Sequence, residues 1–301
     1  MKNIQIPPLE ELPKFSKENW FENIQKSLKN QDLKELYLVR EGLEIDPFPT
    51  DKQYHSKPLN RLKGDWIIAV ETHSETSEAL NREILYYLEN GAEAIKINNE
   101  ANINLSEAFN KVHTSFLHLE IEQDHDFENT NDFHLVSAES SDSLIQEIVD
   151  LMNDIIKLLK SGQVKPTKIN IQTSVNEYMP VSISKLRAIR ILWLNVLKSI
   201  SLPLNPVFLS AKAFAESDNQ NTALIELSTM ALNAVLGTCD LLYLDGKNFD
   251  QNQRRLAINI QHMLKMESKL HLYDDPLAGS YAIEGLTRQI CEKVWSQLSI
   301  D

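Results

Sequence analysis

The sequence predicts an α/β fold, an eight-stranded β/α barrel preceded by an N-terminal extension. Short apolar runs of strand length alternate with helix-like segments between residues 65 and 298, and eightfold alternation is typical of a closed β/α barrel. The runs are mostly continuous, as expected for a parallel sheet covered by helices. A doubly wound open sheet with a second domain would need a glycine-rich turn after the first strand, whereas "AVETHSETSE" there has no glycine.

Residues 1–62 form the predicted extension and residues 63–301 the predicted barrel. In the extension, "SKENWFENIQKSLKN" predicts an amphipathic helix with Ser16 as its N-cap. The stretch "LKELYLVREGLEIDPF" predicts two short strands that turn at Glu41 and Gly42. The polar, proline-punctuated stretch after it predicts a loop.

Within the barrel, each strand-length run precedes a segment of helical spacing or, after the third run, a polar connection. The expected strands are 65–71, 92–98, 115–121, 133–138, 167–173, 205–211, 240–245 and 269–274. The expected helices are 76–91, 106–112, 140–162, 181–200, 221–237, 248–267 and 284–298.

Composition excludes several classes of partner. The 301 residues carry a formal charge of −13, so nucleic acid and anionic membranes are not expected partners. The two cysteines, Cys239 and Cys291, form neither a metal motif nor a disulfide framework, which favours a reduced cytoplasmic setting. The first residues lack a signal core, and no apolar run is long enough to span a membrane.

Polar residues follow most of the predicted strands, where barrel enzymes carry their active sites. We favour the interpretation that they solvate the rim and cap helices. These residues include Glu71, Thr72, His73, Asn98, Asn99, Glu100, Glu120, Glu122, Glu139, Ser174, Asn176, Lys212, Glu216, Ser217, Asp245, Lys247, Asp274 and Asp275. No set of His, Cys or acidic residues has metal-ligand spacing, so no metal site is predicted.

Four stretches carry a resemblance to the methylmalonyl-CoA mutase family. "DDPLAGSYAIEGLT" with "RQICEKVW" resembles the family's D-P-x-x-G-S-Y-x-x-E-x-L-T segment, and "SISKLRAIRILW" resembles its K-L-R-A helix. "NQNTALIELSTMALNAVLGTCDLLYL" and the N-terminal "W…SLK…LYLVREGLEIDPF" resemble two further segments. The resemblance follows the family's order along nearly the whole chain.

The resemblance implies a barrel that holds an acyl-CoA thioester, with cobalamin bound by a separate C-terminal domain. The chain lacks that domain's D-x-H-x-x-G motif and ends after the eighth predicted barrel helix, so we expect no C-terminal cobalamin-binding domain and no cofactor bound by this chain. The sixth predicted strand lacks the family's R-x-H-x-Q-T-S-G segment, and Ala211 falls about where its His would be. Ala cannot donate a hydrogen bond to a thioester carbonyl.

These departures imply a non-catalytic small subunit of the mutase type. Its expected partner is the large catalytic subunit, which would bind adenosylcobalamin and interconvert methylmalonyl-CoA and succinyl-CoA, and the extension would contact that partner. Two alternatives stay open: an acyl-CoA-binding barrel component of a split isomerase, and a free-standing scaffold barrel. No catalytic residue is assigned.

The motif positions Asp275, Gly279, Ser280 and Tyr281 are the candidate site, at the barrel mouth near a substrate or a subunit contact. We favour a structural interpretation, in which Asp-Pro starts a turn, Gly279 adopts an unusual backbone angle, Ser280 caps the helix and Tyr281 packs into the rim. Two further questions concern larger sets of residues. Lys185, Arg187 and Arg190 could contact CoA phosphates, but we favour a solvated helix face or packing through their aliphatic stems. Ile169, Ile171, Phe208 and Tyr243 could plug the barrel if they point inward.

Overall fold

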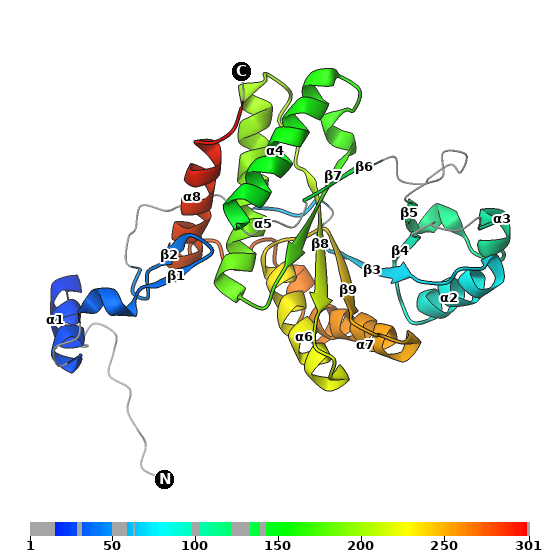
Figure 1. The fold of residues 1–301 in the computed structure, drawn as a ribbon, viewed down its shortest axis with the longest axis horizontal. Coiled ribbons are helices and arrows are strands. Elements are labelled where there is room, and N and C mark those ends of the chain that lie inside the picture. The colour runs from blue at the N-terminus through cyan, green and yellow to red at the C-terminus, as the bar shows by residue number, and fades with distance from the viewer. Residues whose placement is uncertain are drawn as a thin grey trace, which may run out of the picture.

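The protein folds as a curled, all-parallel sheet with helices on its outer face (Figure 1). The computed structural model describes residues 16–28, 32–49, 59–62, 64–97, 103–121, 133–138 and 143–299. The strands of the sheet are β3 (Ile67–Thr72), β4 (Ala94–Ile97), β5 (His118–Ile121), β6 (His134–Ser137), β7 (Ile169–Val175), β8 (Phe208–Ala215) and β9 (Leu241–Gly246), in the order β5-β4-β3-β9-β8-β7-β6. The α/β class and the barrel-like strand order are therefore confirmed.

The helices alternate with these strands as the periodicity predicts. They are α2 (Ser77–Glu89), α3 (Leu105–Ala108), α4 (Leu144–Ser161), α5 (Met179–Ser199), α6 (Gln220–Leu236), α7 (Gln251–His262) and α8 (Tyr281–Trp295). Their ends follow sequence signals. Gly162 ends α4 in the left-handed conformation, with φ 70°, and Asp250 forms a capping box with Gln253 at the start of α7. Among the described residues, none of the helices is both long and apolar enough to cross a membrane.

The prediction of an eighth strand at 269–274 is wrong. Leu270–Leu272 forms a 3-10 turn, after a π-helical turn at Met263–Glu267, and Lys269 adopts the left-handed conformation. The physical reason is that β9 pairs with β8 along one edge and with β3 along the other, so it offers no free edge to a further strand. The described part of the sheet therefore has seven strands, with β5 and β6 at its edges.

Strand alternation separates two faces with different partners. Outward residues such as Ile169 and Ile171 join the main core beneath the helices, whereas Phe208 and Tyr243 belong to a separate cluster on the inner face. Of the four residues that could plug the barrel, only these last two therefore point inward. Ala211 is fully buried in the outer core, so it does not occupy an inner position. The inner positions around it on β8 hold Ser210 and Lys212.

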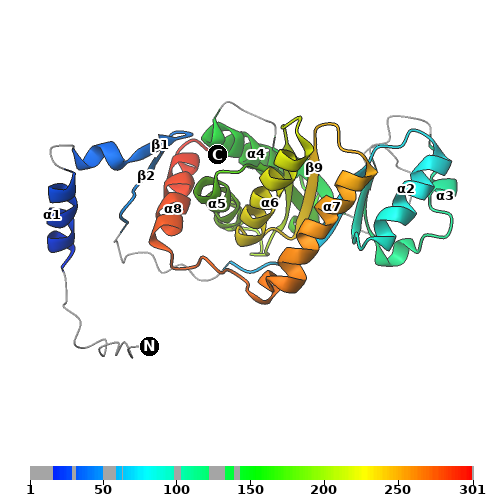
Figure 2. The same ribbon diagram turned by 90° about the horizontal axis from the view of Figure 1, so that it is seen from below.

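The N-terminal extension lies against α8, at the end of the molecule opposite α2 and α3 (Figures 1 and 2). It contains α1 (Lys17–Ser27), a 3-10 turn (Leu33–Leu36) and a hairpin of β1 (Leu38–Arg40) and β2 (Leu43–Ile45). Ser16 caps α1 by accepting a hydrogen bond from the Asn19 N–H, as predicted. Gln289 of α8 bonds to both backbone groups of Glu44, which fastens the hairpin to the helix.

Candidate functional site

Asp275, the first residue of the motif, is a buried structural anchor. Its carboxylate has no exposed surface and pairs with Arg187 of α5, which is itself fully buried. It also accepts a hydrogen bond from the Leu59 N–H at 3.0 Å. Asp275 therefore ties together α5, the segment before α8 and the segment that leads from the extension into the first barrel strand.

The rest of the motif completes the same network. Arg187 donates a second bond to Glu284 at 2.7 Å, and Glu284 accepts the Gly279 N–H at 3.1 Å. Gly279 has φ 82°, which confirms the unusual backbone angle expected of it. Ser280 occupies the N-cap position of α8, but its side chain makes no capping bond. Tyr281 begins α8 and lines a cavity beside the extension.

Of the alternatives for the basic residues of α5, the solvated face is wrong, because these residues are buried. Lys185 bonds to Glu147 at 2.7 Å and Arg190 to Asp240 at 2.7 Å, and all four side chains are buried. Burial lowers the pKa of Lys185, although Glu147 opposes that shift. Because α5 packs beneath α8 and α4, its cations meet carboxylates of neighbouring elements rather than water.

Stacked rings fill the inner face of the sheet near the amino ends of its strands. His118 of β5 stacks on Phe208 of β8, with ring centroids 5.5 Å apart and an interplanar angle of 8°. Phe133 stacks on Phe208 at 4.9 Å. Tyr243 and Ala69 pack in the same cluster, so this level is occupied by side chains.

Above the rings lies a layer of hydrogen-bonded polar groups. Glu120 accepts the Tyr243 hydroxyl at 2.8 Å and the Asn170 amide at 2.9 Å, and Ser210 donates to Asn170 at 2.7 Å. Gln172, which follows Asn170 on the same face of β7, is 7% exposed, and its Nε2 has no hydrogen-bond partner. These side chains come from strands far apart in the sheet order, so they span its interior.

Ion pairs form the next layer, toward the carboxyl ends of the strands. Lys212 Nζ lies 2.9 Å from both oxygens of Glu71, and Lys96 Nζ lies 3.7 Å from one of them. Glu71 and Lys96 are almost completely buried, and Lys212 is 36% exposed. Separating such a pair would leave a buried charge without a partner, which costs about 3–5 kcal/mol.

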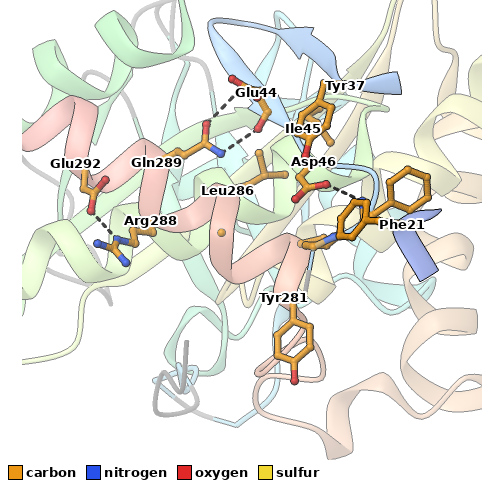
Figure 3. A pocket seen from close by; sticks show the side chains of 14 residues that line it. Phe21, Tyr37, Glu44, Ile45, Asp46, Tyr281, Leu286, Arg288, Gln289 and Glu292 are labelled. Carbon is orange, nitrogen blue, oxygen red and sulfur yellow. Dashed lines mark hydrogen bonds and ion pairs between the residues drawn. The ribbon is translucent and has the colours of Figure 1, made fainter. Parts of the chain in front are cut away.

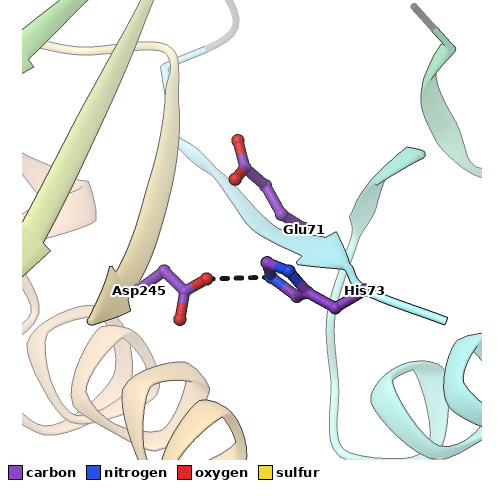
Figure 4. Close-up of side chains that lie close together, drawn as sticks. All are labelled: Glu71, His73 and Asp245. Carbon is purple, nitrogen blue, oxygen red and sulfur yellow. Dashed lines mark hydrogen bonds and ion pairs between the residues drawn. The ribbon is translucent and has the colours of Figure 1, made fainter. Parts of the chain in front are cut away.

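At the carboxyl ends of β3 and β9, His73 and Asp245 meet (Figure 4). His73 Nε2 lies 2.9 Å from Asp245 Oδ2, and Arg254 Nε lies 3.3 Å from Asp245 Oδ1. Burial raises the pKa of Asp245, but the His73 hydrogen bond, the Arg254 charge and the Gly246 N–H outweigh it, so this pKa lies below its ordinary value. Asp245 is thus an ionised carboxylate that orients the imidazole, which is 40% exposed.

Glu71, His73 and Asp245 have the ligand types of a divalent-cation site, with one atom from each within 4.8 Å of the others. Their oxygens already bind cations, however: Lys212 and Lys96 on Glu71, and Arg254 on Asp245. The buried Glu83 carboxylate accepts the His73 N–H beside them, so three cations meet three carboxylates. The oxygens of Glu71 and Asp245 that would bind a metal ion are therefore already neutralised by side chains.

The inner-face network has a sequence signal, which is the change from apolar to polar side chains at alternate positions toward the carboxyl ends of the strands. It comprises Glu71, Lys96, Glu120, Asn170, Gln172, Ser210, Lys212 and Asp245. Several residues from the strand-end loops lie outside the described residues, and nothing is concluded about them: Asn98, Asn99, Glu100, Glu122 and Glu139.

Comparison with known proteins identifies relatives of one family. The family model of methylmalonyl-CoA mutase matches residues 164–300. A methylmalonyl-CoA mutase of Rhizobium meliloti is 26% identical over 179 residues, covering 52% of this chain and 25% of that protein. One of Cereibacter sphaeroides is 31% identical over 126 residues, covering 38% and 18%. The matches span at most about a quarter of the length of these curated relatives.

A search of solved structures found (S)-3-O-geranylgeranylglyceryl phosphate synthase from Thermoplasma acidophilum, with a TM-score of 0.29 and 9% identity over 75% of this chain and 95% of that chain. A score this low carries no weight for fold or function. The family match over residues 164–300 covers α5, α8 and the buried motif that joins them. Through this region the chain is similar to the methylmalonyl-CoA mutase family.

Proposed function

We propose that this chain is a non-catalytic small subunit of the methylmalonyl-CoA mutase type, which binds a cobalamin-dependent catalytic subunit. The observation that supports it is the filled inner face of the sheet, the place where the family resemblance implies an acyl-CoA thioester. Phe208 and Phe133 occupy the inner face near the amino ends of the strands, and the Glu71–Lys212 pair occupies it near their carboxyl ends. The catalytic chemistry and the adenosylcobalamin then belong to the partner.

The inner face of β8 adds to this support. The inward positions of that strand hold Phe208, Ser210, Lys212 and Phe214. None is a histidine, so this strand offers no imidazole toward the axis. Ser210 already donates a hydrogen bond to Asn170, and Lys212 already donates to the Glu71 carboxylate.

The extension is the proposed contact with the partner. Its β1 strand exposes two large apolar side chains, Leu38 at 56% and Val39 at 76%. Exposed apolar side chains on neighbouring positions favour burial against another protein. The substitution Val39→Asp would place a charge in that contact and should weaken the complex by about tenfold or more.

The test is coexpression with the catalytic mutase chain of the same organism, followed by size-exclusion chromatography with light scattering. We expect a stable heteromeric complex, and mutase activity with added cobalamin that depends on this chain. Phe116→Asp is the matched control, because Phe116 is 92% exposed in the α3–β5 connection, at the other end of the molecule. A chain that stays alone beside the catalytic subunit contradicts the proposal.

A second candidate, an acyl-CoA-binding barrel component of a split isomerase, is favoured by two basic side chains at the strand ends. Lys212 and His73 are both partly exposed there and could meet an anionic group. Calorimetric titration with methylmalonyl-CoA and succinyl-CoA separates the candidates. The small-subunit proposal expects no binding heat from this chain alone, and a saturable 1:1 isotherm would favour the second candidate.

A further inference from the structure

A cavity of about 490 Å³ lies between the N-terminal extension and α8 (Figure 3). It is separate from the inner face of the sheet and plays no part in the proposed function. The extension contributes α1 and the segment that runs from β2, and α8 contributes its first three turns. A volume of this size is in the range of small-molecule sites.

Aromatic side chains form part of the cavity wall. Phe21, Tyr37, Phe48 and Tyr281 line it. The Phe48 ring is held in place by Trp20, which meets it edge-on at 5.1 Å. Aromatic faces carry negative charge density and attract cations.

Carboxylates add a negative potential to these walls. Glu44, Asp46 and Glu292 line the cavity together with one cation, Arg288, which pairs with Glu292. Among the ion pairs of the described residues, none involves Glu44 or Asp46. Burial, the Asp46 charge, the side-chain hydrogen bond to Asp46 and the Glu44 charge together raise the pKa of Tyr37, in keeping with a negative environment.

Gly285 leaves the α8 side of the cavity open. A Cβ added at this position would have no atom within 4 Å, so a larger side chain has room to extend into the cavity without a clash. Glycine inside a helix costs about 1 kcal/mol relative to alanine. The open space beside this glycine therefore offers a way to block the cavity while strengthening the helix.

From these observations we propose that the cavity binds an organic cation, an ammonium or guanidinium group on a hydrocarbon stem. The aromatic rings contact the stem and the face of the cation, and the Asp46 carboxylate neutralises its charge. An anion of the same shape would be repelled by the Glu44 and Asp46 carboxylates, for which no ion pair is found among the described residues. The cation could be a free amine or a lysine or arginine side chain of a peptide, since both present the same chemistry.

The test is isothermal titration of the full chain with butylammonium, with acetyl-lysine methylamide and with butyrate as the anionic control. Binding of either cation without binding of butyrate supports the proposal. Binding of butylammonium alone points to a free amine, and tighter binding of acetyl-lysine methylamide points to a peptide side chain. Failure of both cations to bind at millimolar concentration, or equal binding of butyrate, overturns the proposal.

Two variants test the site itself. Asp46→Asn keeps an oxygen for the Phe48 N–H, which Asp46 accepts at 2.7 Å, and should weaken cation binding by about tenfold or more. Gly285→Leu should abolish binding while the melting temperature is kept or raised. Asp154→Asn, which removes an exposed carboxylate on α4, is the matched charge control and should leave affinity unchanged. Unaltered affinity in both cavity variants would refute the site, and the melting temperatures show that each variant is folded.

Discussion

The buried Arg187 network makes the sharpest prediction about stability. Arg187 lies between two carboxylates, those of Asp275 and Glu284, and none of the three side chains is more than 5% exposed. Replacing it by methionine keeps most of the volume but leaves two buried carboxylates facing each other. Breaking a buried pair costs about 3–5 kcal/mol, and the second carboxylate places the expected loss for Arg187→Met at the upper end of that range. Typical domains have a total stability of about 5–15 kcal/mol.

Urea unfolding followed by circular dichroism measures this loss. Arg82→Met is the matched control, because Arg82 pairs with Glu78 on the exposed face of α2, with both side chains over 70% exposed, and it should cost less than about 1 kcal/mol. Adding Asp275→Leu to Arg187→Met should recover part of the loss, because the double variant removes one unpaired charge. A loss below about 1 kcal/mol for Arg187→Met, or strict additivity with Asp275→Leu, would refute a stabilising role of the network.

Three further predictions concern other parts of the fold. Phe208→Ala removes the central ring of the inner stack and should cost about 3–5 kcal/mol in urea unfolding; a loss below about 1 kcal/mol would mean that the inner face is not packed. Because the folded-state pKa of Asp245 is lowered, its contribution to stability is present above the ordinary pKa of an aspartate and is lost as pH falls through the folded value. The stability advantage of the wild type over Asp245→Asn should therefore shrink as the pH falls from about 5 to below 3, and an advantage independent of pH would contradict this. Burial raises the pKa of both Cys239 and Cys291 to about 12, so both thiols should react slowly with Ellman's reagent in the native protein and rapidly in urea, and fast native reaction would show that they are accessible.

Most elements of the fold could be predicted from sequence because local periodicity determines them. Continuous apolar runs mark β3, β8 and β9, and regular i, i+4 spacing marks α4. The eighth strand could not be predicted correctly, because "KLHLYD" alternates as a strand would. Its conformation depends instead on whether β9 has a free edge, and β3 already occupies that edge. Pairing between distant strands is not encoded in a six-residue pattern.

The candidate site was harder to predict than the fold. Its charged residues were visible as strand-end residues, but their pairing depends on strand phase, and a shift of one residue reverses every side chain. Ala211 illustrates this, because the expected inner position belongs to the outer core. The burial of the α5 cations could not be predicted for a related reason. Periodicity shows that Lys185 and Arg190 share a helix with apolar residues, but only the tertiary packing brings Glu147 and Asp240 to them.

The residues that carry the family resemblance are held together by one another. Asp275 and Glu284 of the C-terminal motif bond to Arg187 of the K-L-R-A helix, and the Gly279 N–H bonds to Glu284. Selection for this packing alone would preserve the motif, whatever happens on the inner face of the sheet. The family match over residues 164–300 is therefore evidence for this helix packing and not, by itself, for catalysis. Evidence for or against a reaction has to come from the inner face, where the Glu71–Lys212 pair and the Phe208 stack now fill the space.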